Sequence, residues 1–270
     1  MEQILQKNNY VKNYISSSYP AHIVMIIDQS SMMSEPYSKG KTKAEYVVDD
    51  INNFINQLIF MCCAGDNIKD WFYISIVGHS NNEIKLIESK YLSEFAENPI
   101  RIVKVKKTVA DGAGGWVEIE EEKAEYINPY CEGVSNLFSA FKHIQVLISD
   151  WMNQKQYLST LIINISGGYT AEWQMTTKVI EKIKNLKSNG ENSFLFNWLL
   201  DSNSSNLEFP SLDNVYENSF TSHLFFEWSS YMSGQMIDNC KRFGFNVHQG
   251  AKFFSNKGIN NVLNLINIGS

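Results

Sequence analysis

The chain has 270 residues, of which 44% are hydrophobic and 19% are charged. This length and composition predict one large domain or two small ones, with a core that needs no disulfide to hold it together. Acidic residues outnumber basic residues by 29 to 23, which gives a net charge of −6. That balance argues against nucleic acid or an anionic membrane as the main partner, because both require a basic surface.

The four cysteines are too few and too irregularly spaced for a disulfide framework. Cys62 and Cys63 lie within a helical pattern, and we expect both to be small buried hydrophobic residues. No CxxC motif or matched histidine spacing accompanies them. The sequence also contains no signal-peptide core and no run of 18 apolar residues. We therefore expect a cytoplasmic location and no membrane contact.

The first elements alternate between strand and helix. Residues 22–28 form a nearly continuous apolar run, which is typical of a strand buried on both faces. From 42 to 64, apolar residues recur at spacings of three and four and predict one long amphipathic helix. Residues 71–77 are aromatic and β-branched, so they predict a second strand.

The helical spacing disappears between about residues 80 and 130. Residues 102–106 and 116–120 alternate between apolar and polar, and the Gly-rich segment 111–115 lies between them. This pattern predicts a β-hairpin, which we place at a sheet edge because one of its faces is charged. The Gly-rich segment lacks the Lys-Ser/Thr of a phosphate-binding loop, so we interpret it as the hairpin turn.

Alternation resumes in the second half of the chain. Helical spacing predicts helices over 137–151 and 179–186, and buried strands are predicted over 161–165 and 193–200. A last helix is predicted over 258–266.

Strands that alternate with amphipathic helices predict an α/β fold, in which helices flank a doubly wound, mostly parallel, Rossmann-like sheet. We treat residues 1–20 as an N-terminal extension and 21–270 as a single domain, with an insertion at about 80–130. Ligands of such sheets bind beyond the carboxyl ends of the strands. Functional residues are therefore expected in the loops that follow the strands.

Three loops in order resemble those of the von Willebrand factor A (vWA) family. Asp28-Gln29-Ser30-Ser31-Met32 follows the first strand, Ser135 precedes the second helix, and Ser166-Gly167-Gly168 follows the strand at 161–165. The family's metal-ion-dependent adhesion site reads Asp-x-Ser-x-Ser, then a Thr, then an Asp. The resemblance implies a vWA fold and a place for a divalent cation, such as Mg²⁺, among oxygen ligands.

This chain keeps only part of that ligand set. Asp28, Ser30 and Ser135 match the family, whereas Met32 replaces the second Ser and Gly167 replaces the third-loop Asp. A thioether is a soft ligand that suits Mg²⁺ poorly, and glycine has no side chain. We predict a degenerate metal site.

Two alternatives bear on this site. Ser31 or Thr170 would restore an oxygen ligand if the loops shift in register. Asp28 has a purely structural alternative, because a carboxylate at the end of a parallel strand often accepts backbone N–H bonds from the neighbouring loop.

Segments outside these loops resemble a bacterial, cytoplasmic vWA subgroup that is similar to the TerY-like proteins of tellurite-resistance and stress systems. They are Gly40–Glu45, Asn197 with Phe209-Pro210, Leu224–Ser230 and Ile266–Gly269. The resemblance covers about residues 21–269. Since such proteins tend to be encoded beside a PP2C-type phosphatase and a protein kinase, it implies one of these as the partner.

A partly apolar surface is expected at the strand ends in place of a metal. Methionine and aromatic residues are enriched at protein interfaces. The candidate partner-binding residues are Met32, Met33, Tyr37, Gly167, Tyr169 and Trp173. The alternative is that each of these side chains packs locally against its own loop.

No catalytic constellation is present. The sequence lacks a G-x-S-x-G nucleophile elbow, and its five histidines lack the spacing of a metalloprotease. We predict a non-catalytic protein-interaction module of a bacterial stress or signalling system, with no cofactor. One alternative is an Mg²⁺-dependent module, in which the residual ligands and a partner carboxylate hold the ion. The other is an enzyme acting on a phosphoester or nucleotide at Ser166-Gly167-Gly168, where free N–H groups would bind an anion.

Overall fold

A six-stranded sheet forms the centre of the structure. The computed structural model describes residues 15–81, 83–112, 114–154, 160–168, 170–188, 191–201, 207–215 and 219–265. The strand order is β14-β13-β10-β1-β6-β7, and every neighbouring pair is parallel except β6 and β7. The strands are β1 (Ala21–Asp28), β6 (Phe72–Ser80), β7 (Glu83–Tyr91), β10 (Thr160–Ser166), β13 (Phe194–Leu199) and β14 (Phe254–Ser255). The predicted α/β fold with a mostly parallel sheet is confirmed.

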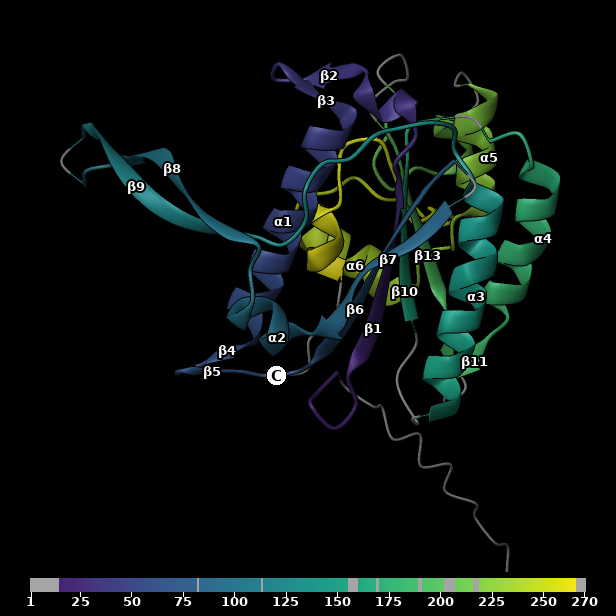
Figure 1. Ribbon diagram of the computed structural model, residues 1–270, viewed down its shortest axis with the longest axis horizontal. Helices are drawn as coiled ribbons and strands as arrows, with labels where there is room; N and C mark the ends of the chain where they lie inside the picture. The colour runs from purple at the N-terminus through teal and green to yellow at the C-terminus, as the bar shows by residue number, and fades with distance from the viewer. Residues whose placement is uncertain are drawn as a thin grey trace, which may run out of the picture.

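Helices cover both faces of this sheet (Figure 1). One face packs against α1 (Lys43–Cys62), α2 (Leu92–Glu97) and α6 (Gly234–Arg242). The other packs against α3 (Leu137–Gln154), α4 (Trp173–Lys184) and α5 (Phe220–Trp228). None of the helices in the described ranges is long and apolar enough to cross a membrane.

Strand β1 explains why the sequence shows a continuous apolar run. All eight of its residues are buried. Ile23 and Met25 belong to the core beneath α1, whereas Val24 and Ile26 belong to the core beneath α3. Successive side chains of a strand point to opposite faces, so a strand covered on both sides needs apolar residues at every position.

The segment at 80–130 contains two elements that the sequence did not reveal. Strand β7 pairs with β6 over its whole length, and α2 follows it directly. β7 lies at the end of the strand order. Its residues are exposed or half-buried, so its apolar residues are interrupted by charged ones and give no clear strand pattern.

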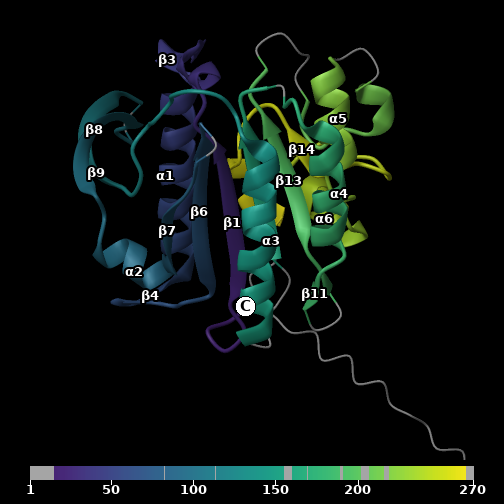
Figure 2. The same cartoon turned by 45° about the vertical axis from the view of Figure 1, so that its right-hand side comes forward.

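The predicted hairpin is confirmed, but its predicted place at a sheet edge is wrong. Strand β8 (Arg101–Ala110) pairs with β9 (Trp116–Glu125) in a sheet of their own. We call this pair the arm. It projects from the body beside α1 (Figures 1 and 2). The turn is closed by the Asp111 N–H, which donates to the Gly115 carbonyl at 3.0 Å.

Two asparagines of α1 hold the base of the arm. The buried Asn52 side-chain oxygen accepts the backbone N–H groups of Tyr126 at 2.8 Å and Ile127 at 3.3 Å. Asn56 donates to the Ala124 carbonyl at 2.8 Å and accepts the Tyr126 hydroxyl at 3.1 Å. These bonds satisfy the backbone where β9 leaves the arm, and they fix its direction relative to α1.

The C-terminal part also differs from the expectation. The residues expected to form a helix at 258–266 form a 3-10 helix over Asn260–Leu265, and α5 and α6 were not predicted. Both are nine residues long, and so short a segment shows few helical repeats. The remaining short elements are 3-10 turns at Ser31–Ser34 and Leu212–Asn214 and the strands β2 (Pro36–Ser38), β3 (Lys41–Thr42), β4 (Cys63–Ala64), β5 (Asn67–Ile68), β11 (Lys187–Ser188) and β12 (Glu191–Asn192).

The expectation for the adjacent cysteines is half right. Cys62 is buried in the core beneath α1, whereas Cys63 is exposed. The reason is that α1 ends at Cys62, so Cys63 no longer follows the buried face of the helix.

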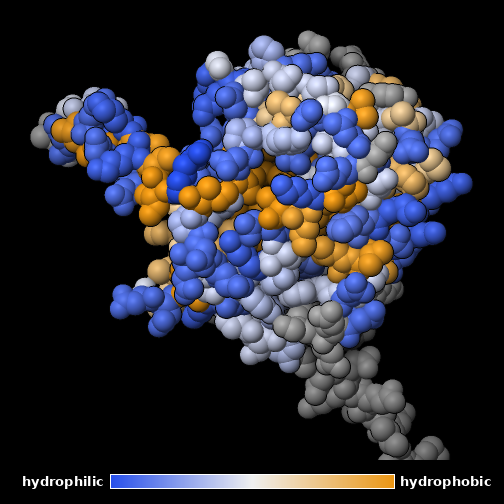
Figure 3. All heavy atoms as spheres, in the orientation of Figure 1, coloured by the Kyte–Doolittle hydropathy of each residue, from blue (hydrophilic) through white to orange (hydrophobic). Residues whose placement is uncertain are grey.

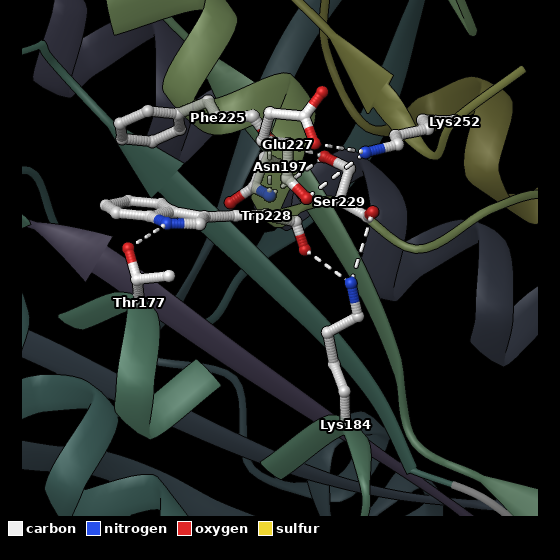
Figure 4. Close-up of polar contacts among 8 residues, drawn as sticks. All are labelled: Thr177, Lys184, Asn197, Phe225, Glu227, Trp228, Ser229 and Lys252. Atoms are coloured by element: carbon white, nitrogen blue, oxygen red, sulfur yellow. Dashed lines mark hydrogen bonds and ion pairs between the residues drawn. The ribbon is translucent and has the colours of Figure 1, made fainter. Parts of the chain in front are cut away.

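The C-terminus of α5 is closed by two lysines (Figure 4). The Lys184 ammonium donates to the carbonyls of Trp228 at 3.1 Å and Ser229 at 3.4 Å. The Lys252 ammonium donates to the carbonyl and the carboxylate of Glu227, both at 3.2 Å. The last carbonyls of a helix carry a partial negative charge, so cations stabilise them. Burial, followed by the charge of Lys252, lowers the pKa of Lys184.

A buried amide pair links this helix end to the sheet. Asn164 of β10 donates to the Asn197 side-chain oxygen of β13 at 2.8 Å. The Asn197 amide in turn donates to the Phe225 carbonyl at 3.1 Å and to the Ser229 hydroxyl at 2.9 Å. Both asparagines are fully buried. Their hydrogen bonds fix the position of α5 against β13. Because both side chains are shielded from water, a broken bond would leave a buried polar group without a partner.

Buried histidine should make the protein sensitive to acid. His22 on β1 is buried, bonds to Ser75 at 2.9 Å and packs against Trp151, and burial lowers its pKa from 6.5 to about 3. Below pH 6.5 the unfolded chain binds a proton at His22, whereas the folded chain stays unprotonated there until the pH approaches 3. The free energy of unfolding is therefore highest above pH 6.5 and falls as the pH is lowered toward 3. The slope is up to about 1.4 kcal/mol per pH unit for one such group.

We expect the His22→Gln variant to show a shallower fall in the free energy of unfolding between pH 6.5 and 5 than the wild type. Urea unfolding at several pH values measures both slopes. The exposed His143 provides the matched control, since His143→Gln should leave the slope unchanged. Equal slopes for wild type and His22→Gln would contradict the prediction.

Candidate functional site

The carboxyl ends of β1, β6 and β10 bring three polar residues together. Asp28 is the last residue of β1 and lies beside His79 of β6 in the parallel register. Ser166 ends β10, the neighbour of β1 on the other side. All three side chains are buried. Parallel strands place their carboxyl ends at one edge of the sheet, so residues far apart in sequence meet there.

Asp28 uses its carboxylate to hold two loops. Its Oδ1 accepts the Ser30 N–H at 2.9 Å, and its Oδ2 accepts the Gly167 N–H at 3.2 Å. The Ser166 hydroxyl lies 3.5 Å from the same Oδ2. These bonds are the ones that the structural alternative for Asp28 describes, since the carboxylate accepts backbone N–H groups from its own loop and from the loop after β10. The carboxylate thereby ties the first loop to the third.

Methionine fills the space where the third-loop acid of the vWA pattern would stand. A Cβ atom added at Gly167 would lie 2.9 Å from Met33 Sδ and 3.6 Å from Asp28 Oδ2. Met33 is fully buried, so its sulfur cannot move outward into solvent without opening a cavity. The packing of Met33 therefore favours a residue without a side chain at position 167.

A buried lysine approaches the same loop from the start of α1. The Lys43 ammonium donates to the Gly167 carbonyl at 3.2 Å and to the Glu35 carboxylate at 2.7 Å. A cation at the first position of a helix is unfavourable for the helix dipole, so these two acceptors hold it there. Lys43 lies in the segment Gly40–Glu45 that carries the resemblance, but the sequence gave it no role at this site.

The residues present do not fit a divalent cation. Asp28 already accepts two backbone N–H groups, Gly167 contributes no side chain, and the Lys43 ammonium adds positive charge beside the third loop. The Ser30 hydroxyl is buried without a hydrogen-bond partner, and Ser135 is half-buried. One engaged carboxylate and two hydroxyls fall short of the oxygen shell that Mg²⁺ requires. Within the described residues, no cluster of three or more His, Cys, Asp and Glu could hold a metal ion.

His79 is a core residue beside this carboxylate. Its Nδ1 accepts the Asn136 N–H at 3.2 Å, which places the ring proton on Nε2, and Nε2 is buried without a partner. Burial lowers the pKa of His79, and the charge of Asp28 opposes that shift. The ring is thus held neutral. It fastens the segment before α3 to the end of β6.

The predicted partner-binding residues do not all reach the surface. Met32 is half-buried, whereas Met33 lies in the core, so Met33 cannot contact a partner as expected. Tyr37 is half-buried and donates its hydroxyl to the Asn256 carbonyl at 3.1 Å. Burial raises the pKa of Tyr37 to about 12. Trp173 packs edge-on against Phe220 with ring centroids 5.7 Å apart, and Tyr169 lies outside the described residues.

Two exposed apolar residues of this end of the molecule were missed. Val134 is 64% exposed, and its neighbour Gly133 accepts the Ser31 N–H and hydroxyl of the first loop. Phe220 is 57% exposed at the start of α5, beside Trp173. Val134 adjoins Ser135, so the sequence had already placed its segment among the site loops, but no pattern pointed to Phe220.

The N–H groups of Gly167 and Gly168, in the loop after β10, already have acceptors within the protein and are not available to an anion. The Gly167 N–H donates to Asp28, and the Gly168 N–H donates to the Ser166 hydroxyl at 3.3 Å. A cavity on the α1 side of Asp28, lined by Ala44, Val48 and Tyr130 among others and by no residue of this loop, has a volume of about 10 Å³, which is room for one water molecule. Ligand pockets of enzymes usually measure about 300–1,000 Å³. This geometry gives no support to the phosphoester or nucleotide enzyme.

Comparisons with known proteins returned matches among solved structures. A scan of the sequence against protein-family models found no match, and a search of the curated proteins found no relative. The chain is similar to the manganese-loaded TRAP protein of Plasmodium vivax, with a TM-score of 0.46, 13% identity, and coverage of 94% of this chain and 74% of that chain.

It is also similar to the SpRpn10 VWA domain, with a TM-score of 0.39, 14% identity, and coverage of 67% of this chain and 75% of that one. The ArnB paralog VWA2 of Sulfolobus acidocaldarius matches with a TM-score of 0.35 and 16% identity. That match covers 69% of this chain but only 36% of the other.

Restoring the third-loop acid should harm this protein. We expect the Gly167→Asp variant to lose about 2 kcal/mol of stability, because its Cβ crowds Met33 and its carboxylate stands beside Asp28. Thermal unfolding in EDTA and in excess Mn²⁺ measures the loss and any recovery. Gly167→Ala separates the steric part from the charge. Full stability of Gly167→Asp without metal would contradict the packing argument.

Proposed function

We propose that this chain is a non-catalytic protein-interaction module of vWA type, which binds a partner protein at the carboxyl ends of its strands without a divalent ion. The observation that carries the proposal is the hydrogen bonding of Asp28. Its two carboxylate oxygens are occupied by backbone N–H groups of the first and third loops. An aspartate used in this way builds a stable loop surface, which is what a docking module needs.

The binding surface is expected to be partly apolar. Its exposed and half-buried members are Met32, Val134, Trp173 and Phe220, contributed by the first loop, the segment before α3, and the starts of α4 and α5. Methionine and aromatic side chains are common in the centres of protein interfaces. Gly167 serves this surface indirectly, because the absence of a side chain allows Met33 to pack beneath it.

The partner we propose is the PP2C-type phosphatase or the protein kinase that the sequence resemblance implies, within a cytoplasmic stress or signalling system of a bacterium. Purified candidates can be tested directly by biolayer interferometry in EDTA. Wild type and Val146→Glu should bind equally, since Val146 is an exposed residue of α3 outside this surface. Met32→Glu and Val134→Glu should each weaken binding by at least about tenfold. Equal binding by all four proteins would refute the proposed surface.

Divalent cations should leave the stability of the protein unchanged. A ligand that binds only the folded state stabilises it by about 2.7 kcal/mol at a hundredfold excess over its dissociation constant. We therefore expect equal melting temperatures in EDTA, Mg²⁺, Mn²⁺ and Ca²⁺. Differential scanning calorimetry provides the measurement.

A second candidate is the Mg²⁺-dependent module. It is favoured by the Ser30 hydroxyl, which is buried without a hydrogen-bond partner beside Asp28. In this alternative a carboxylate of the partner completes the shell around the ion. A rise in melting temperature with Mg²⁺ or Mn²⁺ that Asp28→Asn abolishes would favour it over the metal-free module.

A further inference from the structure

The loops at the carboxyl ends of the strands carry mostly negative charge. Five exposed or half-buried acids belong to them: Glu35 after β1, Glu83 at the start of β7, Glu132 before α3, Glu172 before α4 and Asp201 after β13. The loops at 29–35, 81–83, 128–136, 167–172 and 200–201 contain no lysine or arginine. Figure 3 shows hydrophilic atoms beside apolar ones at the upper end of the molecule, where several of these loops lie.

The lysines around these loops are fewer than the acids. Lys43 is buried and already binds the Glu35 carboxylate at 2.7 Å. The exposed lysines at the borders of the loops are Lys39, Lys41 and Lys85. One of them, Lys41, pairs with an aspartate of α1. Apart from these two pairs, the acids outnumber the lysines, and a surface with an excess of one sign of charge attracts a partner of the opposite sign.

Two of the acids lie beside an exposed apolar pair. Tyr130 and Val134 are 50% and 64% exposed, and Glu132 lies between them in the chain. The Tyr130 hydroxyl donates to the Glu132 carboxylate at 2.8 Å. This bond and the charge of Glu132, followed by desolvation and the charge of Glu83, raise the pKa of Tyr130. Both carboxylates are therefore close enough to the tyrosine for their charges to act on it.

Backbone hydrogen bonds hold these residues in place. The Asn81 N–H donates to the Val134 carbonyl at 2.9 Å, and the Val134 N–H donates to the Asn81 side-chain oxygen at 3.3 Å. The Glu132 N–H donates to the Gln29 carbonyl at 2.7 Å. Glu83 follows Asn81 by two residues, so it enters β7 beside Val134. A surface that is already ordered loses little entropy when a partner binds.

A buried acceptor in the first loop also favours a positively charged group. The Ser30 hydroxyl is 1% exposed and has no hydrogen-bond partner, and the Ser30 N–H binds Asp28. A hydroxyl oxygen beside a carboxylate can accept charge-assisted hydrogen bonds from ammonium and guanidinium groups. Because the residues present do not fit a divalent ion, the cation that suits this end of the molecule is one that a partner carries.

We propose that the docking surface recognises a basic segment of the partner protein. An apolar side chain of that segment packs on Tyr130 and Val134, and its lysine or arginine side chains pair with Glu83 and Glu132. This inference rests on the proposed function and names the chemistry of the partner. It is the opposite of the Mg²⁺-dependent alternative, in which the partner supplies a carboxylate. Complementary charge is screened by salt, so binding should weaken as the ionic strength rises.

A library of random short peptides displayed on phage tests this chemistry without a known partner. Panned against the full chain in EDTA, it should yield peptides with a net positive charge and at least one aromatic or large aliphatic residue. Synthetic peptides of the enriched sequences then serve as probes, and fluorescence anisotropy measures their dissociation constants. Raising the salt concentration from about 0.05 M to about 0.5 M should weaken their binding at least about tenfold.

Paired charge variants locate the binding site. The double variant Glu83→Lys, Glu132→Lys should bind these peptides at least about tenfold more weakly than the wild type. The matched control is Asp66→Lys, Glu97→Lys, which makes the same change in net charge at the other end of the sheet, in the β4–β5 turn and at the end of α2. It should bind like the wild type. Val134→Ser removes an apolar contact without changing the charge and should also weaken binding.

The outcomes separate this inference from the proposed function. Acidic or neutral peptides whose binding is weakened by Val134→Ser would retain the docking surface but overturn the basic partner. Basic peptides that bind equally to the strand-end double variant and to its control would overturn it as well. If no peptide is enriched, or if Val134→Ser and both double variants bind like the wild type, the proposed surface fails together with the inference.

Discussion

Asp28→Ala should lower the free energy of unfolding by about 3 kcal/mol. The variant leaves the buried N–H groups of Ser30 and Gly167 without their acceptor, and each unsatisfied buried group costs about 1–3 kcal/mol. The loss should be the same in EDTA and in Mg²⁺, because the carboxylate serves the loops and not an ion. Urea unfolding in both buffers measures it.

Two further variants separate the contributions at this site. Asp28→Asn keeps one acceptor oxygen and should lose less stability than Asp28→Ala. Asp213→Ala removes an exposed acid from a 3-10 turn and should change stability by less than about 0.5 kcal/mol. If Asp28→Ala were harmless in EDTA but destabilising in Mg²⁺, the carboxylate would be a metal ligand and our assignment would be wrong.

Asn197→Leu should cost about 3 kcal/mol. The substitution keeps the volume of the side chain but leaves the Asn164 amide buried without its acceptor and removes the bonds to Phe225 and Ser229. It should also loosen α5 from the sheet. Relative to the wild type, amide hydrogen exchange in the variant should accelerate more in α5 than in α3. Chemical denaturation measures the loss in the free energy of unfolding.

A double-mutant cycle with Asn164 tests the origin of this loss. Replacing both asparagines by leucine removes donor and acceptor together, so the double variant should be more stable than the sum of the single losses predicts. Strictly additive losses would show that the two amides do not act as a pair.

The alternation of elements was readable from sequence because it depends on local periodicity. The run at 22–28 and the spacing at 42–64 correspond to β1 and α1, which have the two-sided burial and the single apolar stripe that those patterns predict. Strand β7 and helices α5 and α6 were not predicted. Their sequences are short or interrupted by polar residues, and contacts made elsewhere in the fold stabilise them.

The site at the strand ends was likewise only partly predictable from the sequence. The position of Asp28 follows from the end of an apolar run, and so does the absence of a side chain at Gly167. The sequence did not show that Met33 occupies the space beside Gly167 or that Lys43 reaches the Gly167 carbonyl. Both contacts join residues more than 100 positions apart, and no local pattern encodes such a contact.

By itself, the sequence determined the class of fold, the order of its main strands and helices, and the loops that meet at the strand ends. These features depend on the periodicity of apolar residues along the chain. The tertiary structure decided which side chains fill that meeting point and where the arm stands. Buried hydrogen bonds and packing between distant segments set both of these, and their energies depend on the assembled fold.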